Sequence, residues 1–425
     1  MIFLIGGFLV LIVLGFPIVF SLGLISFAYL ATYGIPVITM AQKMVSGINN
    51  YALLAVPFFI LAGNLMNTGG VTMRLFRFAS ALVGWIPGGL GHANVLGSMI
   101  FAGMSGAAIA DAGGLGTIEI RAMQDEGFDT PFSAAVTAAS SVIGPIIPPS
   151  IPMVIYASIA NVSVGKLFLA GMIPGILIGV AEMIMVYFIA KKRKYPVHSG
   201  FNLKETVDSF AKGFFALLTP TIILGGVMFG IFSPTEAAIV ASVYAMVLGF
   251  FIYKELKIKD LYNVIAETIK TTSMVVYIIS AAAIYGFLLG REQVPQDVAR
   301  LLFTISKNPY VIIFIIIVFL TVIGCFLETT AALILLTPIL VPPALELGID
   351  PIHLGLIIVL TLMIGLVTPP VGVVLYITAN VAKISFESLT KATAPFLVPL
   401  FIVLFISAFF PEIVMFLPNY LLGTY

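Results

Sequence analysis

Acidic and hydroxyl side chains occur in two stretches of this chain that are otherwise apolar. Asp111 follows Ser105 within "GMSGAAIADAGG", and Glu328 leads "ETTAALILL" with Thr329 and Thr330. An ionisable side chain at membrane depth is costly and marks a functional site by default. Such a carboxylate could bind a cation, take up a proton, or hydrogen-bond exposed backbone and serve only the structure.

Two further stretches carry paired prolines inside apolar sequence. "IGPIIPPSIPMVIYA" contains Pro148–Pro149, and "GLVTPPVGVVLYITA" contains Pro369–Pro370. Proline lacks an N–H donor and interrupts a helix, and unpaired backbone is tolerated at membrane depth only where it faces protein, water or an ion. Carbonyls near Gly144–Pro148 and Gly365–Pro369 are therefore free to coordinate a hard cation. The alternative is a pair of kinks that only shape packing.

Side chains near these breaks could complete two binding sites. The hydroxyls of Ser105, Ser140, Ser141 and Thr368 could add oxygen ligands for a cation. The half-helix N-terminus beyond each break carries partial positive charge that suits an anion. We expect substrate contacts at Ser105, Gly106, Asp111, Ser150, Thr330 and Arg291.

Positive charge is scarce in the predicted core, which bears on how an anion could be held. Lysine and arginine are absent from the predicted midplane, so an anion would rely on helix N-termini, hydroxyls and bound cations. This favours a sodium-coupled mechanism, in which ions fill the carbonyl sites and their charge helps retain a carboxylate. Arg291 could steer an anion or a docking protein, or could equally be an ordinary interfacial anchor.

The composition indicates a protein whose main solvent is lipid. Of 425 residues, 60% are hydrophobic and only 9% are charged, against about 25% charged in soluble domains. The single cysteine, Cys325, excludes an internal disulfide, and there is no basic tract suited to nucleic acid. The absence of a nucleophile–base pair or of metal-ligand spacing argues against an enzyme, and we expect no organic cofactor or transition metal.

Long apolar runs predict the spanning segments, since a spanning helix needs about 20 apolar residues. We expect spanning helices at 2–32 (a retained helix rather than a signal peptide), 52–68, 168–190, 211–231, 235–253, 264–290 and 395–418. Apolar segments interrupted by Gly, Pro or small polar residues are 92–120, 132–163, 309–345 and 355–382.

Lysine and arginine predict the sidedness of these segments, because cytoplasmic loops carry the excess of basic residues. "KKRK" at 191–194 and the lysines at 254, 257 and 259 would face the cytoplasm, with Arg291 outside. This arrangement works only if 92–120 and 309–345 each enter and leave on one side as re-entrant hairpins. The amphipathic segments 72–85 and 199–210 would lie along the inner interface.

The interrupted segments repeat along the chain. A shift of 221 residues superimposes Gly103 on Gly324 and brings Pro148–Pro149 onto Pro369–Pro370. With opposite orientations this predicts an all-α polytopic membrane protein built as an inverted repeat, with two re-entrant helical hairpins and two discontinuous helices, an arrangement typical of transporters. The predicted units are scaffold helices with an interfacial arm (1–90), transport half 1 (91–165), scaffold helices with interfacial segments (166–308), transport half 2 (309–385) and a C-terminal scaffold helix (386–425).

The motif set as a whole resembles the large membrane subunit of TRAP transporters, the DctM-type permease. "GMSGAAIADAGGLGTIEI", "IGPIIPPSIPMVIYA", "FSPTEAAIVASVYA", "ETTAALILLTPILVPP" and "GLVTPPVGVVLYITAN" carry the resemblance. It implies sodium-driven elevator transport of a small organic acid across the bacterial inner membrane. It also implies two partners: a small four-helix membrane subunit and a periplasmic substrate-binding protein. The motifs look closest to members that carry sialic acid; C4-dicarboxylates and other sugar acids remain open.

The resemblance also carries functional residues over to this chain. It implies two or more sodium sites. The candidate sodium ligands are Gly103, Ser105, Gly144, Pro148, Gly324, Glu328, Thr329, Gly365 and Thr368. This chain has Ala107 and Glu328 where some relatives have Ser and Asp. Two competing functions are a stand-alone sodium/carboxylate carrier and a passive channel or assembly scaffold.

Overall fold

The structure is a computed structural model that describes residues 2–195 and 200–423, and within these ranges it is helical without strands. Eight of the described helices are long and apolar enough to cross a membrane. The elements of the first repeat are α1 (Ile2–Val13), α2 (Ile18–Thr32), α3 (Ile38–Ile48), η1 (Tyr51–Leu54), α4 (Ala55–Thr68), α5 (Val71–Val83), α6 (Gly89–Ser105), α7 (Ala108–Gly113), α8 (Leu115–Asp125), α9 (Thr130–Ser140), η2 (Ser141–Ile143), α10 (Ile151–Ala160) and α11 (Val164–Arg193). The second repeat comprises α12 (Leu203–Met228), α13 (Pro234–Val247), η3 (Leu248–Ile252), α14 (Ile258–Arg291), α15 (Val294–Ile305), α16 (Pro309–Phe326), α17 (Thr329–Glu346), α18 (Pro351–Gly365), α19 (Val373–Ala382), α20 (Phe386–Phe409) and α21 (Pro411–Leu422).

Side-chain caps fix where several helices begin. Asp129 caps α9 by accepting from the Phe132 N–H at 2.8 Å, and Asp350 caps α18 by accepting from Ile352 and His353. These two caps stand 221 residues apart, at the spacing of the repeat. Ser233 and Glu236 form a capping box at the start of α13, as the "FSPTE" sequence indicates.

The N-terminal prediction was wrong in one respect. The run 2–32 is two helices, α1 and α2, that pack against each other, instead of one long spanning helix. Gly15 takes a left-handed conformation with φ of +85° in the connection, and Pro17 precedes α2. The sequence did not predict this turn because the residues on both sides of it are apolar.

The predicted C-terminal span and one interfacial segment also need correction. The run 395–418 is divided by Phe410 into α20 and α21. Residues 203–210 continue without a break into α12 instead of forming a separate interfacial helix. Residue 199, where that interfacial segment was predicted to begin, lies outside the described residues.

Both re-entrant hairpins and both interrupted helices are confirmed. The chain reverses at Gly106, whose φ of +63° lies in the left-handed region, between α6 and the α7–α8 arm. It reverses again between α16 and α17 at Leu327–Glu328. α9 and η2 are separated from α10 by Gly144–Ser150, and α18 is separated from α19 by Leu366–Gly372. The Pro148–Pro149 and Pro369–Pro370 peptides are both cis.

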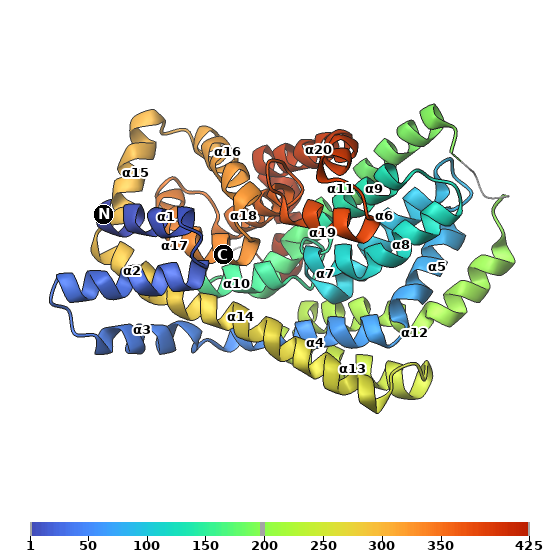
Figure 1. Cartoon of the computed structure of the whole chain (residues 1–425), viewed down its shortest axis with the longest axis horizontal. Helices are drawn as coiled ribbons and strands as arrows, with labels where there is room; N and C mark the ends of the chain where they lie inside the picture. The colour runs from blue at the N-terminus through green and yellow to red at the C-terminus, as the bar shows by residue number, and fades with distance from the viewer. Residues whose placement is uncertain (1, 196–199, 424–425) are drawn as a thin grey trace.

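The helices form two groups of contacts. α4 packs on α13, α14 packs on α2, α3 and α4, and α12 packs on α5 and α13. The hairpins and interrupted helices form the other group, in which α11 and α20 each contact α9 and α18. Figure 1 shows α14 running along one side of the molecule beside α3 and α4, with α7 and α19 near the middle. The arms α5 and α15 join the groups through contacts with α6 and α17.

Candidate functional site

The tip of the first hairpin touches the first helix break. Ser105 ends α6 and Gly106 makes the turn, as the sequence predicts. The N–H of Ile151, the first residue of α10, donates to the Gly106 carbonyl at 3.4 Å. A Cβ on Gly106 would lie 2.7 Å from the Pro149 carbonyl oxygen, so only glycine allows this approach of tip and break.

Asp111 points from the returning arm into the same junction. Its Oδ1 accepts a hydrogen bond from the Ser105 hydroxyl, whereas its buried Oδ2 has no hydrogen-bond partner. A Cβ on Gly144 would overlap Asp111 Oδ2, so the free oxygen lies against the backbone of the break. An unpartnered buried carboxylate oxygen is expensive, and a cation at this point would satisfy it.

The prolines of the first break remove the donors that its carbonyls would otherwise have. In an α-helix the N–H of residue i bonds the carbonyl of residue i−4, so Pro148 leaves the Gly144 carbonyl without this donor and Pro152 does the same for Pro148. The hydroxyl of Ser150 donates to the Pro145 carbonyl at 2.5 Å instead. The carbonyls of Gly144 and Pro148 are therefore without their helical donors, and their role as sodium ligands stays a prediction.

The second hairpin meets the second break through backbone contact. A Cβ on Gly365 would lie 2.7 Å from Gly324 Cα, so two glycines let α16 and the end of α18 touch. The N–H of Gly372 donates to the Cys325 carbonyl at 3.0 Å. Thr368 donates its hydroxyl hydrogen to the Ile364 carbonyl at 2.7 Å, so its oxygen keeps lone pairs for a ligand.

Glu328 has a role that Asp111 lacks, because it caps α17. Its Oε2 accepts from the Ala331 N–H at 3.2 Å and its Oε1 accepts from the Thr330 hydroxyl at 3.0 Å. The hydroxyl of Thr329 is buried without a hydrogen-bond partner. At this tip the Thr329 hydroxyl is therefore the oxygen that remains available to a ligand. The contacts of Glu328 match the alternative in which a carboxylate hydrogen-bonds exposed backbone.

The two junctions lie next to each other but differ in exposure. α7 of the first hairpin packs against α19 of the second interrupted helix (Figure 1), and a Cβ on Gly113 would lie 3.8 Å from the Ile377 side chain. Every residue from 141 to 157 is buried, whereas Pro369 and Pro370 are exposed. The second break therefore faces open space in this conformation and the first does not.

Other candidate residues lie in different surroundings. Gly103 packs against Pro220 of α12, where a Cβ on this glycine would overlap the proline ring. Ser140 belongs to a buried network in which it donates to Asn94 and accepts from Ser98, and Ser141 bonds the Ala138 carbonyl. Ser150 caps α10 with its own hydroxyl by accepting from the Met153 N–H. The structure does not bring Arg291 to the hairpins: it lies exposed at the end of α14, beside Glu292.

Two buried carboxylates add to those predicted at the hairpin tips. Glu119 in α8 is 1% exposed, and its unpartnered Oε1 lies beside Gly97 of α6. Sequence reasoning missed this residue, although an acid inside "GTIEI" was a signal. Glu182 in α11 is fully buried within this chain, with both carboxylate oxygens unpartnered.

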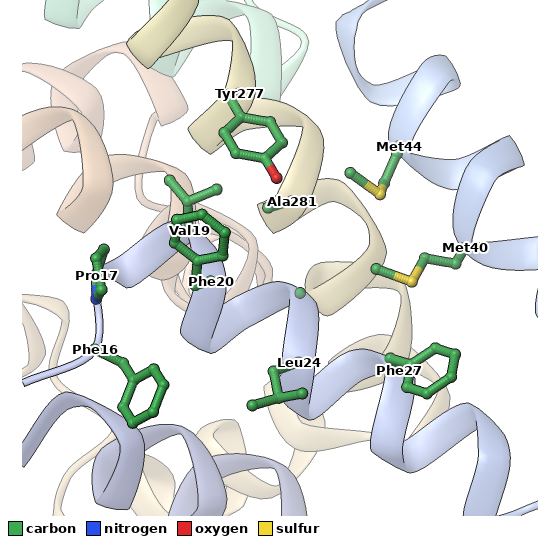
Figure 2. A pocket seen from close by; sticks show the side chains of 11 residues that line it. Phe16, Pro17, Val19, Phe20, Leu24, Phe27, Met40, Met44, Tyr277 and Ala281 are labelled. Atoms are coloured by element: carbon green, nitrogen blue, oxygen red, sulfur yellow. The ribbon is translucent and has the colours of Figure 1, made fainter. Parts of the chain in front are cut away.

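A large groove elsewhere in the molecule has different chemistry. It has a volume of about 610 Å³ between α2, α3 and α14. Figure 2 shows Met40 and Met44 extending from α3 toward a lining that includes Phe20 and Tyr277. This lining is almost entirely apolar, which suits hydrocarbon and not a hydrated ion or an acid.

Together, the helical fold and the paired hairpin–break junctions define a polytopic membrane transporter. The family model of the tripartite ATP-independent periplasmic transporter, DctM component, matches residues 5–413. The chain therefore belongs to the DctM family, and it is the large permease of a TRAP transporter, not an enzyme.

Similar proteins fall within the same family. The sialic acid TRAP transporter large permease protein SiaM of Vibrio cholerae is 47% identical over 418 residues, covering 98% of each chain. The sialic acid TRAP transporter permease protein SiaT of Haemophilus influenzae is 43% identical, covering 97% of this chain and 67% of that protein. The C4-dicarboxylate TRAP transporter large permease protein DctM of Pseudomonas aeruginosa is 40% identical over 90% of each chain.

A solved structure shares the fold at low sequence identity. The Alcanivorax borkumensis YdaH transporter superimposes with a TM-score of 0.66 and 14% identity, covering 87% of this chain and 86% of that one. At this identity the similarity concerns the fold alone.

Proposed function

We propose that this chain performs sodium-coupled uptake of a small acidic sugar, with sialic acid as the first candidate. The observation that carries the proposal is the Asp111–Gly144 junction, where a buried carboxylate oxygen without a partner meets carbonyls deprived of their helical donors. The 47% and 43% identity to two sialic acid permeases supports the choice of substrate. The permease would work in the bacterial inner membrane with a small membrane subunit and a periplasmic substrate-binding protein.

The coupling would follow from charge. A sodium ion at the first junction would contact the free oxygen of Asp111 and the carbonyls of Gly144 and Pro148. A second ion would lie near Thr329, Thr368 and the touching backbones of Gly324 and Gly365. Since lysine and arginine are absent from these two junctions, bound cations would supply the positive charge that an acidic substrate needs.

The movement would be that of an elevator. The moving unit would comprise both hairpins and both interrupted helices, and we add α11 and α20 to it because they pack against α9 and α18. This differs from the sequence-based division, which placed 166–308 and 386–425 in the scaffold. The scaffold would then be α2–α4 and α12–α14, with α5 and α15 as the connecting arms.

Reconstitution tests this function. The permease, a small subunit and a binding protein are placed in proteoliposomes, and uptake of sialic acid is compared with that of C4-dicarboxylates under an inward sodium gradient. We expect sialic acid uptake that needs both sodium and the binding protein. Uptake of free substrate without the binding protein would favour the stand-alone carrier, and flux that ignores the sodium gradient would favour a channel.

Asp111→Asn tests the sodium site. The substitution keeps the size of the side chain but removes the charge that would face the ion. We expect the sodium concentration for half-maximal uptake to rise by on the order of tenfold or more, since contacts to charged groups are worth about 1.5–3 kcal/mol. Asp125→Asn, at an exposed acid on α8, is the matched control. Unchanged sodium activation in Asp111→Asn would remove this carboxylate from the site.

A further inference from the structure

A second cavity lies between the two groups of helices. It has a volume of about 320 Å³ and is lined by residues of α3, the α3–η1 connection and α14 on one side, and of α10 and α17 on the other. We call it the interdomain crevice. Its polar lining comprises Ser46, Asn49, Asn50 and Ser158, and its apolar lining includes Ile279, Gly286 and Ile334.

The crevice lies toward the outer end of α14. Lys257 and Lys259 precede or begin this helix and Arg291 ends it, so the basic-residue rule places the Arg291 end outside. Ile279 and Gly286 precede Arg291 by 12 and 5 residues, which corresponds to roughly 18 and 8 Å along the helix. Ile334 and Pro338 of the lining follow the second hairpin tip at Glu328 by 6 and 10 residues along α17, the arm that returns outward. A solute arriving from outside would therefore meet the crevice before this tip.

The polar groups of the crevice are neutral and can both donate and accept hydrogen bonds. Asn50 already spans the gap: its Nδ2 donates to the Ser158 carbonyl at 3.3 Å and its Oδ1 accepts from the Ala52 N–H at 2.9 Å. Asn49 and Ser46 are exposed. No carboxylate is among the lining residues, so nothing there repels an anion.

One positive charge stands at the edge of the crevice. Lys43 lies one helical turn before Gly47, and its Nζ sits 4.4 Å from the centre of the Phe287 ring, next to Gly286. A neutral hydrogen-bonding lining with the Lys43 ammonium beside it suits a molecule with a carboxylate and several hydroxyls.

We propose that the interdomain crevice is an outer docking subsite for a hydroxyl-rich carboxylic acid of the acidic-sugar class. The amide of Asn49, the second Nδ2 hydrogen of Asn50 and the hydroxyl oxygen of Ser46, whose hydrogen bonds the Lys43 carbonyl, bind the hydroxyls of the solute, and the Lys43 ammonium attracts its carboxylate. The subsite rests on the proposed uptake function, because it holds the substrate between delivery and the hairpin sites.

Cysteine protection tests occupancy without requiring turnover. Ser46→Cys is made in a Cys325→Ala background and labelled with a membrane-impermeant maleimide in sodium-free buffer, in the complete transporter. We expect sialic acid to slow labelling at least threefold and fumarate, which lacks hydroxyls, to leave it unchanged. Equal protection by fumarate, or none by either acid, overturns the proposal.

A glycine in the lining allows the crevice to be filled. A Cβ on Gly286 meets open space, as does one on Gly290, one turn later in α14 and outside the crevice. We expect Gly286→Leu to raise the KM for sialic acid uptake at least tenfold and to abolish the protection of Ser46→Cys. Gly290→Leu is the matched control and should change neither. Normal KM and protection in Gly286→Leu contradict the subsite.

The two proposals fail in different ways. If the wild-type complex transports no sialic acid but takes up another acid, the substrate assignment is wrong and the crevice proposal falls with it. If sialic acid is transported normally and neither protection nor the Gly286→Leu effect is seen, the crevice proposal alone is wrong.

Discussion

At the scale of single residues, two acids in similar hairpin tips have different roles. Sequence predicts that Asp111 and Glu328 both lie in hairpins at membrane depth near a helix break. In the structure Asp111 lies against Gly144 of the first break, and Glu328 begins the returning arm of the second hairpin; their depth in the membrane stays a prediction. Sequence does not distinguish the two acids, because the difference lies in which oxygens the local backbone satisfies. Both Glu328 oxygens accept hydrogen bonds at the start of α17, whereas Asp111 keeps one oxygen free. Glu119 was missed because its burial depends on the packing of α6 and α8.

Gly144→Ala tests how tightly the first junction is built. The added Cβ would overlap the Asp111 carboxylate, and overpacking of this kind costs roughly 1–3 kcal/mol. We expect a lower Tm of the detergent-solubilised protein and at least a tenfold loss of sodium-driven uptake.

Gly225→Ala provides the matched control, since a Cβ at this position in α12 meets open space. Its Tm and uptake should match those of the wild type. Normal uptake by Gly144→Ala would show that transport does not require the Asp111 carboxylate to lie against Gly144.

At the scale of elements, prolines and caps made the interrupted helices predictable. Proline removes specific donors, which predicts the breaks at Pro148–Pro149 and Pro369–Pro370. The pair Pro342–Pro343 lies inside the continuous helix α17, so a proline pair does not break a helix in every setting. The turn between α1 and α2 was missed because a uniformly apolar run gives no polar signal for a turn. The division between α20 and α21 was also missed, because Pro411 at the start of α21 is the local sequence signal for it.

Replacing Pro148 and Pro149 together by alanine tests the first break. The substitutions restore the donors for the Gly144 and Pro145 carbonyls, so α9 and α10 can approach a continuous helix. We expect uptake to be abolished while the protein still inserts, as measured by membrane yield and by uptake in proteoliposomes. Near-normal uptake would mean that the prolines only shape packing.

The start of α9 carries a charge cluster that predicts a pH dependence. Asp129 accepts hydrogen bonds from Tyr195 and from Phe132, and pairs with Arg193 at 2.8 Å. Burial raises its pKa, but these bonds and the Arg193 charge outweigh burial and hold the pKa of Asp129 below its ordinary 3.8. A carboxyl whose pKa is lowered by folding stabilises the fold above the ordinary value, and that contribution disappears as pH falls through the folded value.

Asp129→Asn and Asp129→Ala separate charge from capping. Asparagine can still cap a helix, whereas alanine loses the cap at a cost of about 1 kcal/mol. We expect the Tm difference between wild type and Asp129→Asn to be constant from pH 8 to 5 and to shrink below pH 3.8. Asp129→Ala should be less stable than Asp129→Asn at every pH. A Tm difference that does not change with pH would exclude the charge contribution.

At the scale of the whole molecule, the repeat and its hairpins were predictable, and the grouping of helices was not. The repeat could be predicted because the matching glycines and prolines of its two halves have a constant spacing in the sequence. Which helices form one packed group depends on tertiary contacts: α11 and α20 contact α9 and α18 although their sequences are typical of ordinary spanning helices. The unequal exposure of the two breaks is a property of one conformation, so it could not be predicted from the sequence.

A cross-link between the helix groups tests the elevator. Asn50 and Ser158 lie on opposite sides of the interdomain crevice and share a hydrogen bond of 3.3 Å. We expect a short thiol-reactive cross-linker between Asn50→Cys and Ser158→Cys, in a Cys325→Ala background, to stop uptake, and a reductant-cleavable linker to make the block reversible.

Phe314→Cys with Phe405→Cys is the matched control, because these two rings are 6.1 Å apart on α16 and α20 within the proposed moving unit. Cross-linking this pair should leave uptake unchanged. Continued uptake after complete cross-linking of the Asn50/Ser158 pair would rule out relative movement at this point.

The unequal exposure of the two breaks implies an order of ion release. Pro369 and Pro370 lie at the surface of the chain, while the chain around Pro148 and Pro149 is enclosed. An ion near Thr368 would therefore exchange with the surrounding solution quickly, and one beside Asp111 would wait for the hairpin tip to lift. Sodium leaving this conformation would do so in two kinetic phases, the slower one belonging to the enclosed position.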